Sequence, residues 1–281
     1  MLVRFWGVRG SIPVSGADYA RYGGDTACVE LRTANDDVVV VDAGSGIRRL
    51  GSRLIEEGRK DLIMLFTHVH LDHILGFPFF RPLYQEGTHL LIFDCPMAQG
   101  DMHTLLSTMM APPFFPIPLG DVKARVTHSQ ACAMEGEITI SSMEVRSIPL
   151  SHPNLGLGYK FTEKDKTFVF LTDNELGHHH RGGATYKEYV EFCRDADLLV
   201  HDSEFTKDEY RQTKSWGHST YTEALRLAQD AGVASFGLYH HNQDRSDHAL
   251  DDMVEHCRQI VAADGGGPEC FAVYQDQEIT L

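Results

Sequence analysis

The sequence predicts an α/β protein in which two mixed β-sheets pack together and helices cover them on the outside. Apolar runs of strand length recur along the chain, and stretches with helical periodicity separate several of them. The strands come in groups early in each half, and helices follow. Two packed sheets with outer helices satisfy this pattern, because each sheet then buries both of its faces.

Each expected element is set by its own run of residues. We expect strands at residues 2–8, 28–32, 38–41, 62–66, 90–93, 138–148, 157–161, 167–171, 198–200, 235–239 and 271–274. We expect helices at residues 47–57, 74–84, 98–110, 186–195, 221–230 and 248–262. There is no linker or low-complexity segment, so we expect residues 1–281 to form a single domain.

Composition and charge narrow the class of partner. The chain has 281 residues, and its formal net charge is −15. Such an acidic surface repels a phosphate backbone and makes nucleic acid an unfavourable partner. A small phosphorylated substrate stays compatible with this charge, because a metal site reverses the local sign.

The cysteines and the apolar segments indicate where the protein resides. The six cysteines contain no C-x-x-C pair, which favours reduced thiols in a cytoplasmic protein over disulfides or a structural zinc site. We find no signal-peptide pattern and no run of about 18 apolar residues, so we expect no membrane association.

Four ligand-type side chains follow one buried strand. The apolar run 62–66 leads into Thr67-His68-Val69-His70-Leu71-Asp72-His73. In an extended segment His68 and His70 point to the same side, and Asp72 and His73 come round as the chain enters a helix. One pair can hold one metal ion and the other pair a second. Two ions about 3.5–4 Å apart can act together on a phosphoryl group.

Further ligand-type residues follow other strands. His152, Asp173 and the pair His240-His241 each come directly after an apolar run. Strand ends at one edge of a sheet are where α/β folds place their chemistry. Strand alternation favours His240 over His241 as the side chain that faces this site.

This order of motifs resembles the metallo-β-lactamase superfamily. H-x-H-x-D-H, a lone His, an Asp and a final His, each after a strand, are its signature, and the resemblance implies an αββα sandwich. It assigns His68, His70 and His152 to one metal, Asp72, His73 and His240 to the other, and Asp173 as the bridge beside a hydroxide. It also implies that Asp42, which ends the strand 38–41, orients a ligand histidine.

Two further segments resemble the phosphodiesterase branch of that superfamily. His201-Asp202-Ser203 and Gly217-His218-Ser219-Thr220 look like the paired H-E-A-T and H-S-T segments of ribonuclease Z and the cyclic-phosphate and cyclic-nucleotide phosphodiesterases. Here Asp202 replaces the Glu of the first segment. His201, which ends a buried strand, is expected to be a packed structural histidine.

The residues themselves also favour a catalytic role for His218. Thr220 and Glu223 form a capping-box pattern at the start of the expected helix 221–230. His218 therefore lies just outside a helix N-terminus, where a phosphoryl group is favoured. A carboxylate such as Asp202 would orient the imidazole, which could then protonate a leaving alkoxide. The role of the run His178-His179-His180 stays open, as a solvated loop or an entrance to the site.

We therefore expect a dinuclear metal-dependent phosphodiesterase that hydrolyses a small phosphodiester, such as a cyclic nucleotide. Asp72, His218 and Asp202 are its expected catalytic residues, and two divalent ions, Zn or else Mn or Fe, its cofactors. The alternatives are an RNA-processing nuclease like ribonuclease Z and a non-catalytic metal-binding sensor or scaffold. Whether the chain forms a homodimer stays open.

Overall fold

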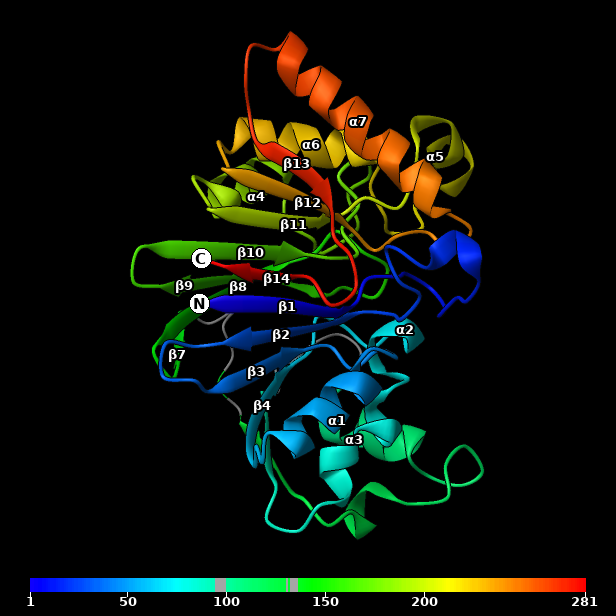
Figure 1. Cartoon of the computed structure of the whole chain (residues 1–281), viewed down its shortest axis with the longest axis vertical. Helices are drawn as coiled ribbons and strands as arrows, with labels where there is room; N and C mark the ends of the chain where they lie inside the picture. Colours follow the sequence, from blue (N-terminus) through cyan, green and yellow to red (C-terminus); the bar gives the residue numbers. More distant parts are fainter. Residues whose placement is uncertain (94–99, 130, 132–135) are drawn as a thin grey trace.

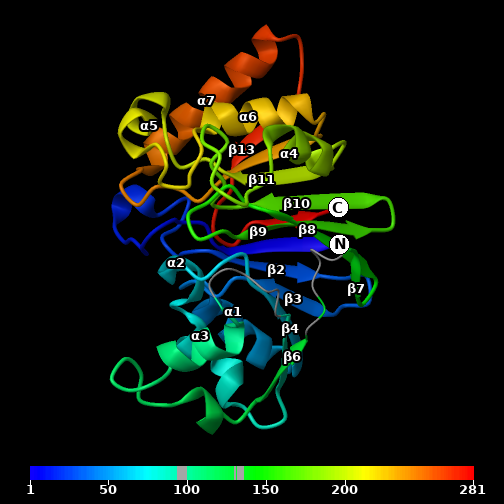
Figure 2. The same ribbon diagram turned by 180° about the vertical axis from the view of Figure 1, so that it is seen from behind.

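Two mixed β-sheets pack face to face, and helices cover their outer faces (Figure 1). The computed structural model describes residues 1–93, 100–129, 131 and 136–281. Helices α1 and α3 lie on one side of the sandwich, and α4, α6 and α7 lie on the other, as the reverse view also shows (Figure 2). The expected α/β class with two mixed sheets flanked by helices is confirmed.

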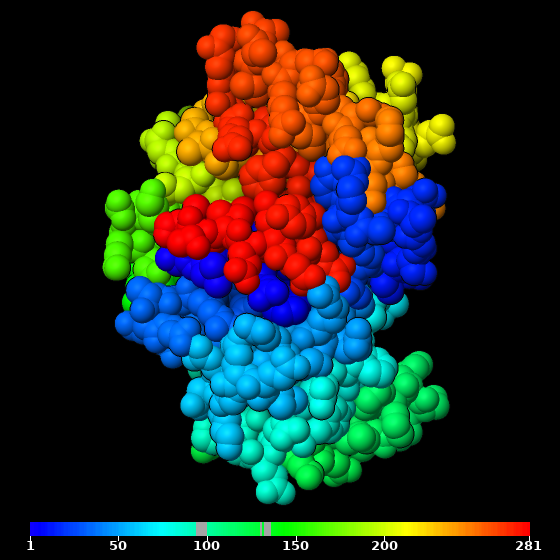
Figure 3. All heavy atoms as spheres, viewed as in Figure 1, coloured from blue at the N-terminus to red at the C-terminus, as the bar shows by residue number. Residues whose placement is uncertain are grey.

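The first sheet contains seven strands within the described residues. In spatial order they are β14 (Glu278–Thr280), β1 (Leu2–Gly7), β2 (Cys28–Arg32), β3 (Val38–Val41), β4 (Asp61–Leu65), β5 (His89–Phe93) and β6 (Arg125–Ser129). The pairs from β14 to β3 are antiparallel, and those from β3 to β6 are parallel. The C-terminal strand thus returns to lie beside the N-terminal one, as the space-filling view shows (Figure 3).

The second sheet also contains seven strands within the same described ranges. Their spatial order is β13 (Glu269–Ala272), β12 (Ser235–Tyr239), β11 (Leu198–Asp202), β10 (Lys166–Leu171), β9 (Leu157–Glu163), β8 (Met143–Pro149) and β7 (Ile138–Ile140). The strands from β10 to β13 are parallel, and those from β7 to β10 are antiparallel.

The helices fill the connections between these strands. The α-helices are α1 (Ile47–Glu56), α2 (Leu71–Ile74), α3 (Met102–Met109), α4 (Tyr186–Cys193), α5 (Lys207–Thr213), α6 (Tyr221–Asp230) and α7 (Asp247–Ala263). The described residues also form four short 3₁₀ helices: η1 (Ala17–Tyr19), η2 (Phe77–Phe79), η3 (Arg81–Tyr84) and η4 (Leu119–Asp121). Among the described helices, none has the length and apolar character needed to cross a bilayer.

Three apolar clusters hold these layers together. The central cluster lies between the sheets, and Phe5 and Val41 of the first sheet share it with Phe168 and Tyr239 of the second. The other two clusters join each sheet to its outer helices. Burying apolar surface on both faces of each sheet is the main favourable term for this architecture.

Two expected elements are divided in the structure. The run 138–148, predicted as one strand, forms the hairpin of β7 and β8, in which Ser141 takes a left-handed backbone with φ 57°. The predicted helix 74–84 is wrong: α2 starts earlier at Leu71, and η2 and η3 follow it. Pro78 and Pro82 explain this break, because proline has no amide hydrogen to donate within a helix.

Several other bounds differ from the sequence prediction. The strands β6 and β14 and the helix α5 were not predicted, and β13 begins earlier than the expected strand 271–274. The helix expected at 98–110 appears as α3, and its first expected residues lie outside the described part of the chain. The strands β6, β13 and β14 lie at the edges of the sheets, and α5 has a polar sequence, so apolar periodicity is weak in these four elements.

The two sheets place several strand ends at one edge of the sandwich. Asp42 follows β3, Asp173 follows β10 and His240 follows β12, and each has a positive φ of 64°, 54° and 56° respectively. Asp and His adopt the left-handed region more readily than most residues. The chain therefore turns sharply at these three points and gathers their side chains at one place.

Candidate metal centre

The first group of ligand atoms comes from both sheets. His68 and His70 follow β4, His152 follows β8, and Asp173 follows β10. One atom from each of these side chains lies within 4.8 Å of all the others. His68 Nε2 lies 3.4 Å from Asp173 Oδ2, and His152 Nε2 lies 3.0 Å from His70 Nδ1. Ligands around one tetrahedral ion are separated by similar distances, roughly 3.4 Å.

The second group shares Asp173 with the first. Its other members are Asp72 and His73 in α2 and His240 after β12, and the four ligand atoms again lie within 4.8 Å of one another. His73 Nε2 lies 3.2 Å from Asp173 Oδ1, and His240 Nε2 lies 3.1 Å from Asp72 Oδ2. The structure thus brings together all seven residues that the sequence predicted as metal ligands, in the two expected groups.

Two of these histidines are oriented by side chains of the first sheet. His73 Nδ1 donates to Asp42 Oδ2 at 2.8 Å, the orienting contact expected for Asp42. Thr67 Oγ1 also donates to Asp42 Oδ2, so its oxygen can accept from His68 Nδ1 at 3.1 Å. A protonated Nδ1 leaves the Nε2 lone pair of each ring available to a metal ion.

Two more of the ligand histidines are oriented by the second half of the chain. His152 Nδ1 donates to the carbonyl of Gly217 at 2.9 Å, and His240 Nδ1 donates to Glu204 Oε2 at 3.1 Å. Gly217 has φ 101°, and a Cβ there would lie 2.1 Å from His152 Nδ1. Only glycine allows this carbonyl to approach the ring so closely.

The electrostatics of the centre favour bound cations. His68 Nε2 and His73 Nε2 are buried and have no hydrogen-bond partner within the described residues, an arrangement that is unfavourable unless a ligand completes it. The carboxylates of Asp72 and Asp173 are also buried, and buried anions are unfavourable unless a cation compensates for them. Imidazole and carboxylate donors fit a divalent transition-metal ion.

His218 lies next to the centre and outside both groups. Its Nδ1 donates to Asp202 Oδ2 at 2.9 Å, and Asp202 also accepts from the backbone amides of Asn174 and Ser219. Burial alone would lower the pKa of His218, but Glu204 and Asp202 outweigh this effect and raise the pKa to about 9. The expected pair of Asp202 and His218 is therefore brought into contact.

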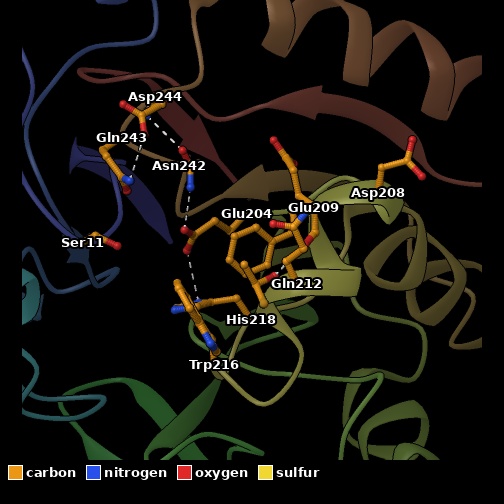
Figure 4. A pocket seen from close by; sticks show the side chains of 12 residues that line it. Ser11, Glu204, Asp208, Glu209, Gln212, Trp216, His218, Asn242, Gln243 and Asp244 are labelled. Carbon is orange, nitrogen blue, oxygen red and sulfur yellow. Dashed lines mark hydrogen bonds and ion pairs between the residues drawn. The ribbon is translucent and has the colours of Figure 1, made fainter.

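The capping pattern that motivated this placement is also present. Thr220 caps α6 and forms a capping box with Glu223. His218 precedes the helix by three residues and borders a cavity together with Glu204, on which Figure 4 centres.

The remaining histidines are placed away from the ligand groups. His241 Nε2 donates to the carbonyl of Val273 at 2.7 Å, on the opposite side from His240. His201 is buried as expected, and its Nδ1 donates to the carbonyl of Asp202. Of the run 178–180, His180 donates Nε2 to Glu175 at 2.8 Å, whereas His179 is exposed.

Sequence reasoning missed two buried glutamates. Glu204 orients His240 and lies 3.4 Å from His218 Nδ1. Glu175 is 1% exposed and accepts four hydrogen bonds, two of them from the loop that leads to His218. Glu204 comes two residues after the end of the buried strand β11 (Leu198–Asp202). This position could have indicated that Glu204 contacts the site. Nothing local in the sequence indicates the contacts of Glu175.

Comparisons with known proteins show the family and the fold. A family model described as the Beta-lactamase superfamily domain matches residues 37–241. Ribonuclease Z of Haloarcula marismortui is 24% identical, with 95% of each chain covered. The human short form of tRNase Z superposes with a TM-score of 0.64 at 20% identity, covering 100% of this chain and 99% of that one. A diphosphatase of the PhnP family has a TM-score of 0.69 at 15% identity, with 100% and 97% covered.

Metal analysis tests the ligand assignment. We expect the purified protein to bind close to two divalent ions per chain. His68→Ala should lower the metal content, and Asp173→Ala should lower it further because Asp173 faces both groups. His179→Ala, an exposed neighbour outside both groups, is the matched control and should retain the full content. Full metal content in Asp173→Ala would contradict the assignment.

The orienting role of Asp42 has a separate test. Asp42→Asn should keep the fold but lower the metal affinity by about 10–100-fold, because the amide holds His73 less well than the carboxylate. Titration with a competing chelator measures this affinity. Asp61→Asn, at an exposed position, is the control. Equal affinities in the Asp42 variant and the wild type would show that the contact does not tune the centre.

Proposed function

This chain belongs to the β-lactamase superfamily, and from that membership we propose that it is a two-metal phosphodiesterase acting on a small phosphodiester. The relatives named ribonuclease Z support a metal-dependent hydrolase of phosphodiester bonds, as the sequence predicted. The observation that carries the proposal is the centre itself, where four histidines hold Nδ1 in hydrogen bonds and direct Nε2 to two ligand groups that share Asp173.

Seven residues would hold the two metal ions. His68, His70 and His152 would hold one ion, Asp72, His73 and His240 the other, and Asp173 both. Bound divalent ions would supply charge neutralisation at the phosphoryl oxygens and activation of water. Zn fits this donor set, as do Mn and Fe.

His218 is the proposed proton donor to the leaving oxygen. Its Nδ1 is fixed by Asp202, so the other ring nitrogen is left for the leaving oxygen of a substrate bound beside it. An imidazole held in one orientation can protonate an alkoxide as the ester bond breaks. Asp202 acts through His218, since it touches the ring and lies fully buried behind it.

An RNA substrate is the second candidate. The curated relatives support this candidate, because they are named ribonuclease Z. One of these relatives comes from Haloarcula marismortui. These relatives weaken the expectation that nucleic acid is an unfavourable partner. The net charge of −15 still opposes a long phosphate backbone, so the small phosphodiester is the proposal we favour.

Leaving-group dependence tests the role of His218. His218→Ala should lower kcat by roughly 10²–10⁴-fold for a 3′,5′-cyclic nucleotide, whose leaving alkoxide needs a proton. The loss should be smaller for bis(p-nitrophenyl) phosphate, because p-nitrophenolate leaves without protonation. Asp202→Asn should show the same pattern more weakly. Metal content should be unchanged in both variants. An equal loss for all leaving groups would indicate that His218 binds phosphoryl oxygens instead.

A substrate panel tests the reaction class. We expect the metal-loaded protein to hydrolyse bis(p-nitrophenyl) phosphate or a cyclic nucleotide with a higher kcat/KM than any β-lactam or thioester. Chelation should abolish this activity, and added metal should restore it. Cleavage of precursor tRNA at physiological salt, with no activity on small diesters, would favour the RNA candidate.

A further inference from the structure

A cavity of about 540 Å³ opens directly beside His218. Its walls come from three separate parts of the chain: Ser11 after β1, the loop 242–244 after β12, and the helix α5 with the residues that follow it (Figure 4). His218 and Glu204 border the same space. A group attached to a phosphate beside His218 would therefore extend into this cavity.

Trp216 forms one wall and is 62% exposed. Figure 4 shows it next to His218. Trp6, the other tryptophan of the chain, is 3% exposed and donates Nε1 to Glu30. Burying an indole is strongly favourable, and Trp is enriched at interfaces. The position of Trp216 beside the proposed proton donor indicates a contact with substrate.

The backbone on both sides of Trp216 is fixed by one buried carboxylate. Glu175 accepts from the amide of Ser215 at 2.7 Å and from the amide of Gly217 at 2.8 Å. The hydroxyl of Tyr210 donates to the same carboxylate at 2.6 Å. Hydrogen bonds to an ionised acceptor are strong, so the loop is held in one conformation. The backbone that carries the indole is thus fixed, which lowers the entropic cost of binding.

The charge of the cavity limits what can bind there. Four carboxylates line it, from Glu204, Asp208, Glu209 and Asp244, and the described lining residues include neither Lys nor Arg. Arg245 offsets Glu209 through a 2.6 Å ion pair, Arg211 lies 3.3 Å from Asp208, and His218 Nδ1 lies 3.4 Å from Glu204. The four carboxylates still outnumber these three cationic groups, so the balance is negative. A second phosphate or a carboxylate would be repelled from this space, whereas an uncharged or cationic group would not.

We propose that this cavity binds the alcohol group of the phosphodiester that stays on the phosphate, that this group presents an apolar face and carries no negative charge, and that Trp216 is the specificity-determining residue that contacts it. This inference rests on the proposed phosphodiesterase function. It defines the substrate as a diester with a single phosphate, since a neighbouring phosphate would meet the carboxylates. Trp216 provides the apolar surface, and Glu175 positions it.

A series of p-nitrophenyl diesters tests the contact, because the leaving group stays the same. The methyl group of methyl p-nitrophenyl phosphate is too small to cover the indole, whereas the phenyl group of phenyl p-nitrophenyl phosphate can stack on it. We expect Trp216→Ala to lower the phenyl-to-methyl ratio of kcat/KM by roughly tenfold, the size of one aromatic contact, and Trp216→Phe to retain most of it. Tyr274→Ala, at another exposed aromatic residue, should leave the ratio unchanged.

A charged member of the series tests the carboxylates. The wild type should hydrolyse 4-carboxyphenyl p-nitrophenyl phosphate with a lower kcat/KM than the phenyl ester, and Asp208→Asn combined with Asp244→Asn should narrow that difference. If the wild type hydrolyses the phenyl and 4-carboxyphenyl esters with equal kcat/KM, the proposed selection against negative charge is wrong. If Trp216→Ala lowers kcat/KM for the methyl and phenyl esters by the same factor, the proposed specificity role of Trp216 is wrong.

Tryptophan fluorescence separates this proposal from the phosphodiesterase function. Diphenyl phosphate should quench the emission of the wild type but not that of Trp216→Phe, and dimethyl phosphate should quench neither. If diphenyl phosphate quenches Trp216 but the metal-loaded protein hydrolyses no diester, the proposed function fails and the binding site stands. If diesters are hydrolysed without quenching and without a change of ratio in Trp216→Ala, the binding site is overturned.

Discussion

The structure depends on burying several carboxylates and imidazoles together at one edge of the sandwich. Asp173 is 1% exposed and faces His68, His73 and His240. A buried charge is costly unless oppositely charged groups or metal ions compensate for it. The two sheets provide this compensation only when they are packed against each other, because each ligand group contains residues that follow strands of both sheets. Correct packing of the central core and assembly of the centre are therefore coupled.

Further hydrogen bonds hold the imidazoles of that cluster in the orientation that metal binding requires. Asp42 fixes His73 from the first sheet, and Glu204 fixes His240 from the second. Because each orienting group comes from a different element, no single loop determines the geometry of the centre. The left-handed turns after β3, β10 and β12 carry some strain, which the surrounding hydrogen bonds offset. Strain of this kind is found at functional sites more often than elsewhere.

The metal ligands could be predicted from short segments of the sequence. The residues that were not predicted make their contacts with parts of the chain that are distant in sequence. The segment from His68 to His73 places four donors after one strand, so its meaning can be read without knowing the fold. Glu175 is different, because its role depends on amides about 40 residues away in sequence. The strand β6 and the helix α5 were missed because they bury little apolar surface. The prolines that divide the expected helix 74–84 were visible in the sequence and are sufficient to explain that error.

The acidity of the chain and its proposed chemistry are compatible once charge is considered locally. A net charge of −15 opposes phosphate over most of the surface, but two divalent ions would reverse the sign at the centre alone. The carboxylates Asp208 and Asp244 then limit the attractive region on the side of the cavity. A diester with one phosphate can place it at the centre and leave its uncharged remainder beside Trp216. A polynucleotide cannot do so without bringing further phosphates towards these carboxylates, and this asymmetry is the physical basis for favouring a small substrate over RNA.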